Sequence, residues 1–275
     1  MTRFPKLEPL GFDPTIPNQA RIYDYLVGGK DNFAADREAA RWALSVAPEL
    51  PMMCREGRRF LERVVRHLAG RGVRQFVDVG CGLPTQGNVH EIAQAAAPGS
   101  RVVYVDNDPV VVTHARALLE DEEHTAVIEA DMREPDQVLG HPRLKSLIDL
   151  GSPVAILLFF ALDVIPEDEL AAHIVGRFRD AIAPGGYVAI GHSVSDLRPE
   201  ATAGLADLYQ SRGVVTGHAH REQQRTKADV EGLFDGLSLV PPGVVYIPAW
   251  GADAGQDTLD PRAIWSVGGV GRKDA

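Results

Sequence analysis

The sequence predicts an α/β fold in which a mostly parallel β-sheet is covered by helices on both faces. Three observations lead to this prediction. From Gln75 onward, short apolar runs alternate with segments of helical periodicity, which is typical of a doubly wound sheet. A glycine-rich turn follows the first apolar run, and acidic residues close three successive runs. Ligands of such sheets bind at the carboxyl ends of the strands, so we expect a binding site there.

Residues 1–74 are expected to form an N-terminal arm and a helical lid region. Residues 1–17 carry four prolines, which fix φ and block helix continuation, so this stretch is predicted to be extended. From Asn18 to Gly72 the pattern is helical, most clearly in REGRRFLERVVRHLAGRG. The stretch ARIYDYLVGGKDNF is predicted to be a lid over the ligand site. The alternative is a helix that packs through its tyrosines and ends at a glycine.

Residues 75–275 are expected to form the Rossmann-like core, integrated with the N-terminal region into one domain. The predicted parallel strands are Phe76–Val79, Val102–Val105, Ala126–Glu129, Val154–Phe160 and Tyr187–Gly191. The helices predicted between them are Val89–Ala97, Pro109–Glu120, Pro135–Leu150 with a break, and Glu167–Ile182. The second of these helices has the clearest start, because Asp108 is a good N-cap and a proline follows it.

The last part of the chain is predicted to add two helices and a closing pair of strands. Residues 198–237 contain the helices, and Thr226 is a plausible N-cap for the second. Val244–Pro248 and Ala263–Val270 read as the strands, and a long loop joins them.

Composition excludes several classes of function. Lys and Arg total 28 against 38 Asp and Glu, a net charge of −10, which disfavours nucleic-acid binding because that depends on neutralising phosphates. Only two cysteines are present, which fits a reducing compartment. The longest apolar run, Val154–Leu162, is far shorter than the roughly 20 residues that cross a membrane. We therefore expect a cytoplasmic protein without membrane association.

The turn after the first predicted strand, DVGCGLPTQGN, indicates a nucleotide-like ligand. Gly80 and Gly82 occupy the first two glycine places of the dinucleotide fingerprint, but Thr85 stands in the third. Asp78 would repel a pyrophosphate and attract a sulfonium or ammonium group. The turn therefore favours S-adenosylmethionine over NAD. The simpler alternative is that Asp78 only caps the turn.

Two further acids end the next two strands. Asp106 follows the glycines by about two dozen residues and could accept hydrogen bonds from both ribose hydroxyls of an adenosine. Asp131 could accept from the adenine amino group, while Met132 offers a backbone N–H to the ring. A helix N-cap and an ordinary turn acid are the respective alternatives. Because parallel strands end at one edge of the sheet, the three acids are expected to share one site.

The runs DVGCG, YVDNDP, ADMREP and APGGYVAIGHS resemble a class I S-adenosylmethionine-dependent methyltransferase. More narrowly, ARIYDYLVGGKDNFAADRE, QFVDVGCGLPTQGNVHEIAQ and RVVYVDNDPVVV resemble a bacterial S-adenosyl methyltransferase family that was formerly a domain of unknown function. The resemblance extends from about Asn18 to Lys273, nearly the whole chain. It implies a seven-stranded sheet whose last strand is reversed.

The resemblance also implies roles for individual residues. Those at the methionine part are Asp78, Gly80 and Gly82, with Cys81 and Asn88 as further cofactor-binding candidates from the same turn. Those at the ribose are Asp106 and Asn107, and those at the adenine are Asp131 and Met132. Those under the cofactor, facing the reacting methyl group, are Phe159, Phe160 and Ala161. The chain departs from the pattern at Pro84, where broader methyltransferases have a third glycine, and at Asp163, where relatives commonly have a histidine.

Methyl transfer from a sulfonium depends mainly on holding three atoms in line, and a general base is needed only if the acceptor must lose a proton. The candidate catalytic residues are His192, Asp163 and Tyr23, of which His192 follows the fifth strand. A loop histidine bonded to the backbone is the alternative. Arg21 is a candidate partner for the cofactor carboxylate and, with Tyr23, belongs to the predicted lid. His218, His220 and Glu222 could form a metal triplet, but a solvated loop is the simpler interpretation and no metal is expected.

The sequence thus predicts a methyltransferase that modifies a small-molecule acceptor. The alternative is a regulatory or sensor protein that binds S-adenosylmethionine and transfers nothing, because no base is unambiguous. An NAD-dependent oxidoreductase is the weakest candidate, since the third glycine is missing and Asp78 is present. A homodimer is compatible with the sequence, and neither the acceptor nor the methylated atom can be identified from it.

Overall fold

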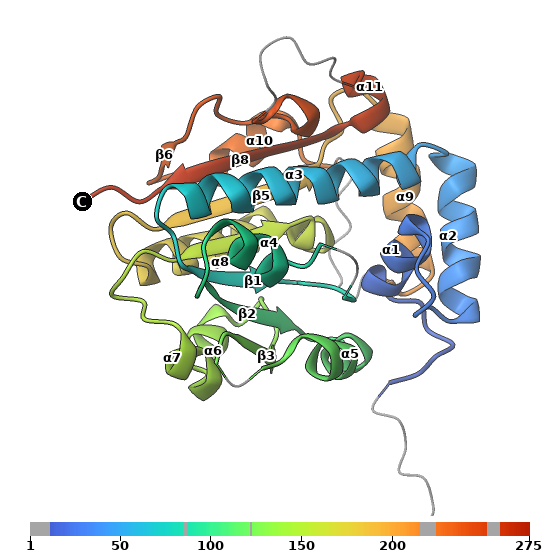
Figure 1. Cartoon of the computed structure of the whole chain (residues 1–275). Coiled ribbons are helices and arrows are strands. Elements are labelled where there is room, and N and C mark those ends of the chain that lie inside the picture. Colours follow the sequence, from blue (N-terminus) through green and yellow to red (C-terminus); the bar gives the residue numbers. More distant parts are fainter. Residues whose placement is uncertain (1–11, 85–86, 122, 215–223, 252–258) are drawn as a thin grey trace, which may run out of the picture.

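A twisted, mostly parallel β-sheet crosses the middle of the molecule, with helices on both faces (Figure 1). The computed structural model describes residues 12–84, 87–121, 123–214, 224–251 and 259–275. The predicted fold class is confirmed. Most of the predicted arm, the His218–Glu222 cluster and much of the loop after Gly251 lie outside the described residues.

The strands follow the order β3-β2-β1-β4-β5-β8-β6, and β7 also pairs with β8. Their bounds are β1 Gln75–Val79, β2 Arg101–Asp106, β3 Thr125–Glu129, β4 Ala155–Phe159, β5 Tyr187–Ser193, β6 Ser238–Leu239, β7 Val245–Tyr246 and β8 Ser266–Arg272. The first five are parallel, and β8 runs antiparallel to β5. The reversed strand implied by the resemblance is therefore present.

The outer edge of the sheet differs from the implied seven strands. The described sheet has eight, because the strand beyond β8 consists of two short pieces, β6 and β7. Pro241 and Pro242 lie between the pieces and have no N–H to donate to a β-ladder, which explains the interruption. The strand predicted at Ala263–Val270 begins late, since its first residues belong to the short helix α11, which starts at Pro261.

The helices include all those expected from the periodicity. Their bounds are α1 Gln19–Val27, α2 Ala34–Val46, α3 Leu50–Gly70, α4 Val89–Ala96, α5 Pro109–Leu119, α6 Pro135–Gly140, α7 Pro142–Leu147, α8 Asp168–Ala181, α9 Pro199–Ser211, α10 Lys227–Gly232 and α11 Pro261–Ile264, with 3₁₀ turns η1 Ala161–Val164 and η2 Ile247–Ala249. The break expected in the helix after β3 lies at His141, immediately before a proline. Among the described helices, none combines the length and the apolar character needed to cross a membrane.

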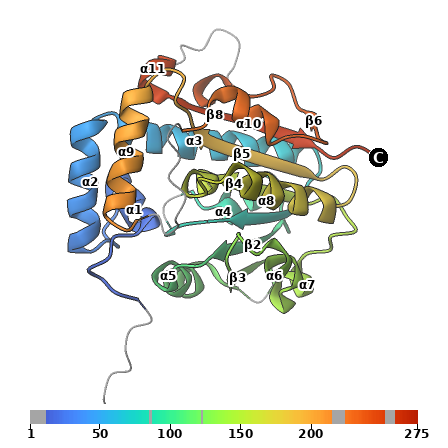
Figure 2. The ribbon, with the colours of Figure 1, turned by 180° about the vertical axis from the view of Figure 1, so that it is seen from behind.

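Alternating side chains of the strands supply two hydrophobic cores. In β1, Phe76 belongs to the core under α3, α4 and α5, whereas Val77 and Val79 belong to the core under α6, α7, α8 and α10. Both faces of the sheet are thus covered, as the two opposite views show (Figures 1 and 2). Continuous burial of β1 explains why its sequence is apolar apart from Gln75 and Asp78.

A separate group of helices covers the carboxyl ends of the parallel strands. Helix α1 packs against α2 and α3, and α2 packs against α9, which comes from a distant part of the chain. Figures 1 and 2 both place α1, α2 and α9 beside the same end of the sheet. Helices therefore cover the carboxyl-terminal edge of the sheet, where the sequence predicts a ligand.

Candidate active site

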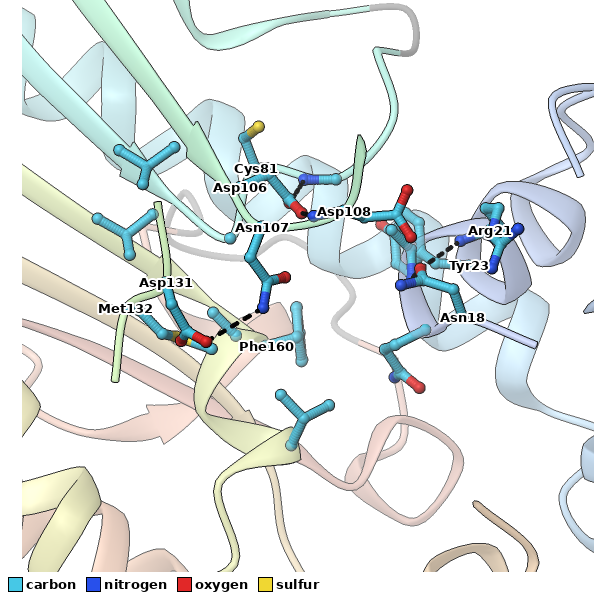
Figure 3. Close-up of a pocket in the computed structure, with 18 of the residues that line it drawn as sticks. Asn18, Arg21, Tyr23, Cys81, Asp106, Asn107, Asp108, Asp131, Met132 and Phe160 are labelled. Carbon is cyan, nitrogen blue, oxygen red and sulfur yellow. Dashed lines mark hydrogen bonds between the residues drawn. The ribbon is translucent and has the colours of Figure 1, made fainter. Parts of the chain in front are cut away.

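A cavity of about 400 Å³ lies at the carboxyl ends of β1, β2 and β4, between the sheet and α1 (Figure 3). This volume is within the range of small-molecule sites. The predicted cofactor residues that line it are Arg21, Tyr23, Asp78, Gly80, Cys81, Gly82, Asp106, Asn107, Asp131, Met132, Phe159, Phe160 and Ala161. Asn88 does not line the cavity, because it begins α4, where its backbone N–H donates to Glu91 at 2.7 Å.

The turn after β1 comes close to the end of β4, and this contact requires a glycine. Gly80 and Gly82 have φ values of 71° and 65°, in the left-handed region. A Cβ placed on Gly80 would lie 2.7 Å from the Cβ of Ala161. The N–H groups of Gly80 and Cys81 both donate to the carbonyl of Val105, which fixes the turn against β2.

Asp78 is a buried acid that accepts no hydrogen bond from a described residue. Its exposed fraction is 6%. Burial raises the pKa of Asp78 to about 7, and Asp106 raises it further while Arg58 opposes the shift. A positively charged ligand group beside Asp78 would favour its ionised form.

Asp106 keeps part of its accepting capacity for a ligand. One carboxyl oxygen accepts the N–H of Gly82 and the other accepts the N–H of Asp108, both at 3.0 Å. A carboxylate has about four accepting positions, so roughly two remain. Burial raises the pKa of Asp106 to about 6, although these N–H groups lower it. The predicted N-cap role belongs to Asp108, which accepts from Val110 and Val111 at the start of α5.

Asp131 is more heavily engaged than the sequence suggests. Its carboxylate accepts the side chain of Arg133 at 2.6–3.0 Å, the backbone N–H of Arg133 at 2.9 Å and Asn107 at 3.4 Å. Burial alone would raise the pKa of Asp131, but the bonds from Arg133 hold it below its ordinary value. A bond from Asp131 to an adenine would have to compete with this pair.

Arg21 is buried at the cavity wall with unused donors. Its exposed fraction is 3%, its guanidinium carbon lies 5.5 Å from the ring centroid of Phe12 and 5.3 Å from that of Phe33, and Nη2 donates to the carbonyl of Ile16. Nε lies 3.6 Å from Asp36, while neither Nε nor Nη1 has a hydrogen-bond acceptor in the part of the chain that the structure describes. Leaving a buried charged donor unsatisfied costs free energy, so Nη1 is ready for an anionic partner.

Tyr23 is held by the neighbouring helix. Its hydroxyl donates to the carbonyl of Cys54 in α3 at 2.9 Å, and burial raises the pKa of Tyr23 well above its ordinary value. A phenol in this state keeps its proton, which does not favour Tyr23 as a general base. The alternative to the lid is a helix that packs through its tyrosines and ends at a glycine. The structure has such a helix end, since Gly28 caps α1 with φ 91°.

The residue after β4 has an unusual backbone. Phe160 has φ 60°, a left-handed conformation that a non-glycine residue rarely adopts, and its ring lies against Gly57 of α3. Such outliers cluster at functional sites. The positive φ ends the strand at Phe159 and turns Ala161 toward the glycine turn.

The other two predicted catalytic residues lie in a second cavity of about 130 Å³, next to the first. His192 and Asp163 face each other there, with Nδ1 of His192 3.0 Å from the carboxylate. Sequence reasoning missed Gln19, which lines both cavities and whose buried Oε1 has no partner. It also missed Arg58 as a cavity residue. Neither belongs to a strand end or a glycine turn, so no local signal marked them.

Comparison with known proteins identifies the family. The family model described as S-adenosyl methyltransferase matches residues 6–274. The chain belongs to the S-adenosyl methyltransferase family. No curated protein matches the sequence.

Two solved structures resemble this S-adenosyl methyltransferase closely. A DUF574 family protein from Streptomyces avermitilis has 40% identity and a TM-score of 0.87, covering 95% of this chain and 99% of its own. A candidate methyltransferase from Thermobifida fusca also has 40% identity, with a TM-score of 0.85, covering 98% of this chain and 100% of its own. The chain is thus an S-adenosylmethionine-dependent methyltransferase of class I fold.

The residues of the cavity fit the cofactor of S-adenosyl methyltransferases. Asp78 offers a buried carboxyl group without a described hydrogen-bond donor to a cation, and Arg21 offers to an anion buried donors that have no acceptor among the described residues. Gly80 leaves space that a Cβ would fill. A ligand with a sulfonium, a carboxylate and a nucleoside meets these requirements together, whereas a pyrophosphate would place negative charge beside Asp78.

Proposed function

We propose that this enzyme holds S-adenosylmethionine in the 400 Å³ cavity and methylates a small molecule. The observation that carries the proposal is the buried carboxyl group of Asp78 beside the glycine turn, which accepts no hydrogen bond from a described residue and whose pKa burial raises despite the nearby charge of Arg58. A cationic ligand removes the free-energy cost of ionising that group in a buried position.

Individual residues would hold separate parts of the cofactor. The remaining accepting positions of Asp106 suit the two ribose hydroxyls, with Asn107 beside them. Arg21 suits the carboxylate through its unused Nη1, and Asp78 with Cys81 lies nearest the expected sulfonium end. Met132 would contact the adenine, and Asp131 would do so only if Arg133 shares the carboxylate.

When bound, the cofactor supplies an electrophilic methyl group on a sulfonium, and its thioether product is a good leaving group. The protein contributes by orienting the acceptor and by excluding water. Phe159, Phe160 and Ala161 wall the cavity at the end of β4, where the turn at Phe160 is fixed by a bond from its N–H to the carbonyl of Gly191 at 2.7 Å. Rigid placement of this wall favours in-line attack without a strong base.

A small-molecule acceptor suits the covered position of the site. Helix α1 and its neighbours α2 and α9 lie over the strand ends, which limits access for a macromolecule. We also propose that the enzyme works in the cytoplasm, since Cys54 and Cys81 are free thiols.

Calorimetric titration tests the cofactor assignment. The full chain should bind S-adenosylmethionine and its demethylated product, whereas NADH should give no heat. Asp106→Asn should weaken binding of both nucleosides by about tenfold or more, the scale of a lost hydrogen bond to a charged group. Tighter binding of NADH would overturn the proposal. Binding without turnover across a broad library of small acceptors would instead support a sensor.

A further inference from the structure

The second cavity adjoins the first, and the two share part of one wall. Gln19, Val164 and Ile165 line both. Its volume of about 130 Å³ is similar to that of an engineered cavity, about 150 Å³, that binds benzene. It therefore has room for one small ring or a group of similar size. A molecule seated there could extend past Gln19 toward the cofactor cavity.

Arg225 lines this cavity, and its N–H groups are all bonded to other protein groups. Arg225 has an exposed fraction of 2%, and each of its five N–H groups has an acceptor. The acceptors are the carbonyls of Leu162, Ile165 and Glu167, the carboxylate of Asp168 and Nε2 of His192, at 2.9–3.3 Å. Arg225 thus fixes the segment after β4 and has no donor left for a ligand.

The contact with Arg225 also determines the state of His192. Because a guanidinium can only donate, Nε2 of His192 must accept, and its proton lies on Nδ1. Nδ1 points to the carbonyl of Ser193 at 2.6 Å and to Asp163 at 3.0 Å. A doubly protonated ring would set one donor against another at Nε2. His192 is therefore neutral, and neither ring nitrogen is available as a base.

Asp163 remains as the charged group that can meet a ligand. Its side chain is 18% exposed, and the described groups within hydrogen-bonding distance of its carboxylate are Nδ1 of His192 at 3.0 Å and the N–H of Ser193 at 3.3–3.4 Å. The orphaned Oε1 of Gln19 adds a second hydrogen-bond acceptor on the shared wall. Apolar side chains such as Leu50, Val164 and Leu205 form much of the rest.

The carboxylate of Asp163 favours a ligand group that donates hydrogen bonds and carries positive charge, and Oε1 of Gln19 adds a further acceptor. We propose that the second cavity is the acceptor subsite and takes a small amine, whose N–H groups bond to Asp163 and Gln19 while its apolar part fills the cavity. For transfer, the ammonium gives one proton to the carboxylate of Asp163, which passes it to solvent. The freed lone pair of the amine then takes the methyl group, and S-adenosylhomocysteine leaves with the electron pair of the broken S–C bond. The inference rests on the proposed methyl transfer, but its binding chemistry can be tested alone. The carboxylate of Asp163 would repel a carboxylate on the ligand, so anionic acceptors should bind poorly.

Binding of three small probes of equal shape tests the chemistry. We expect protein-detected NMR on the full chain to show benzylamine binding about tenfold or more tightly than benzyl alcohol, as for a hydrogen bond to a charged group. Benzoate should not bind. Equal affinities for the three probes would overturn the proposal.

Three variants locate the site. Asp163→Asn should remove the preference for benzylamine. Ala206→Leu, which fills the second cavity from α9, should abolish benzylamine binding, whereas Ala203→Leu on the same helix, outside both cavities, should not. A preference that survives both Asp163→Asn and Ala206→Leu would refute the assignment. Affinity for S-adenosylhomocysteine, measured in the same samples, separates failure of this inference from failure of the cofactor assignment.

Discussion

Asp78 shows how one residue can lower stability in return for binding. Its pKa of about 7 in the folded protein exceeds the ordinary value of 3.8 because the group is buried. Between these two pH values the folded state holds a proton that the unfolded chain has released. The free energy of unfolding therefore falls as pH rises through this window and stays low above it. A cation beside the carboxylate would reverse the effect.

Replacing Asp78 by Asn should accordingly stabilise the cofactor-free protein at pH 8. The gain should be roughly 2–4 kcal/mol, because each unit of pKa shift corresponds to about 1.4 kcal/mol. At pH 4 the gain should nearly vanish, since Asp78 is then protonated in the folded state. Urea unfolding at both pH values measures the difference. A variant equally destabilised at both would show that Asp78 holds the turn together.

The same carboxyl group should make cofactor binding depend on pH. Between pH 6 and 8 the affinity for S-adenosylmethionine should rise, because the sulfonium favours ionised Asp78. S-adenosylhomocysteine has a neutral sulfur, so its affinity should rise less. Calorimetry across this range measures how the affinity for each ligand depends on pH. In Asp78→Asn the two ligands should show the same pH dependence. Parallel curves in the unmodified protein would place the sulfonium away from Asp78.

At the scale of elements, the connection from α1 to α2 explains the stretch YDYLVGGKDNF, which carries part of the resemblance to the family. The carboxylate of Asp24 accepts the N–H of Asp31 at 2.9 Å and the side chain of Asn32 at 2.7 Å. A Cβ on Gly29 would lie 1.9 Å from that carboxylate. The motif thus builds a compact loop that seats α1 over the cavity. The hydrogen bonds of this loop hold the backbone in place, and they influence the site only through the position of α1.

Helix α3 contributes to the site through Gly57, whose lack of a side chain leaves room for the ring of Phe160. A Cβ on Gly57 would lie 2.7 Å from the ring of Phe160, whose strained backbone limits how it can move. Gly57→Ala should displace this ring and weaken S-adenosylhomocysteine binding by about tenfold, since misplacement of about 1 Å in a site can cost more than that. Gly70→Ala, in the same helix with open space around it, is the matched control. Unchanged affinity in Gly57→Ala would mean that Phe160 does not shape the cofactor site.

At the scale of the molecule, sequence reasoning succeeded where a signal is local. Strands β1 to β5 are apolar runs, and the cavity acids lie at or just beyond the ends of β1, β2 and β3. It missed the interruption between β6 and β7, because strands of two residues have no periodicity.

The second cavity was not predictable either. Its lining combines Leu50, His192, Leu205 and Trp265 from distant segments, which only tertiary packing brings together. The same holds for the neutral state of His192. That state follows from Arg225, 33 residues away in the chain.

The cavity also links two parts of the molecule that are far apart in sequence. Arg21 and Tyr23 reach it from α1, and Asp78 and Asp106 reach it from the sheet. A ligand bound to both should therefore stabilise their contact. At 100 times its dissociation constant, S-adenosylhomocysteine should add about 2.7 kcal/mol, which corresponds to a rise of roughly 5 °C in Tm.

Hydrogen exchange then shows whether α1 acts as a lid. If α1 closes over the ligand, amides of α1 should exchange more slowly in the complex, whereas those of α10, which pack behind β8 away from the cavity, should not change. Arg21→Ala should remove much of the protection of α1, because it removes the α1 group best placed to hold the ligand carboxylate. A Tm rise without slower exchange in α1 would mean that this helix is a fixed wall and that the ligand enters by another route.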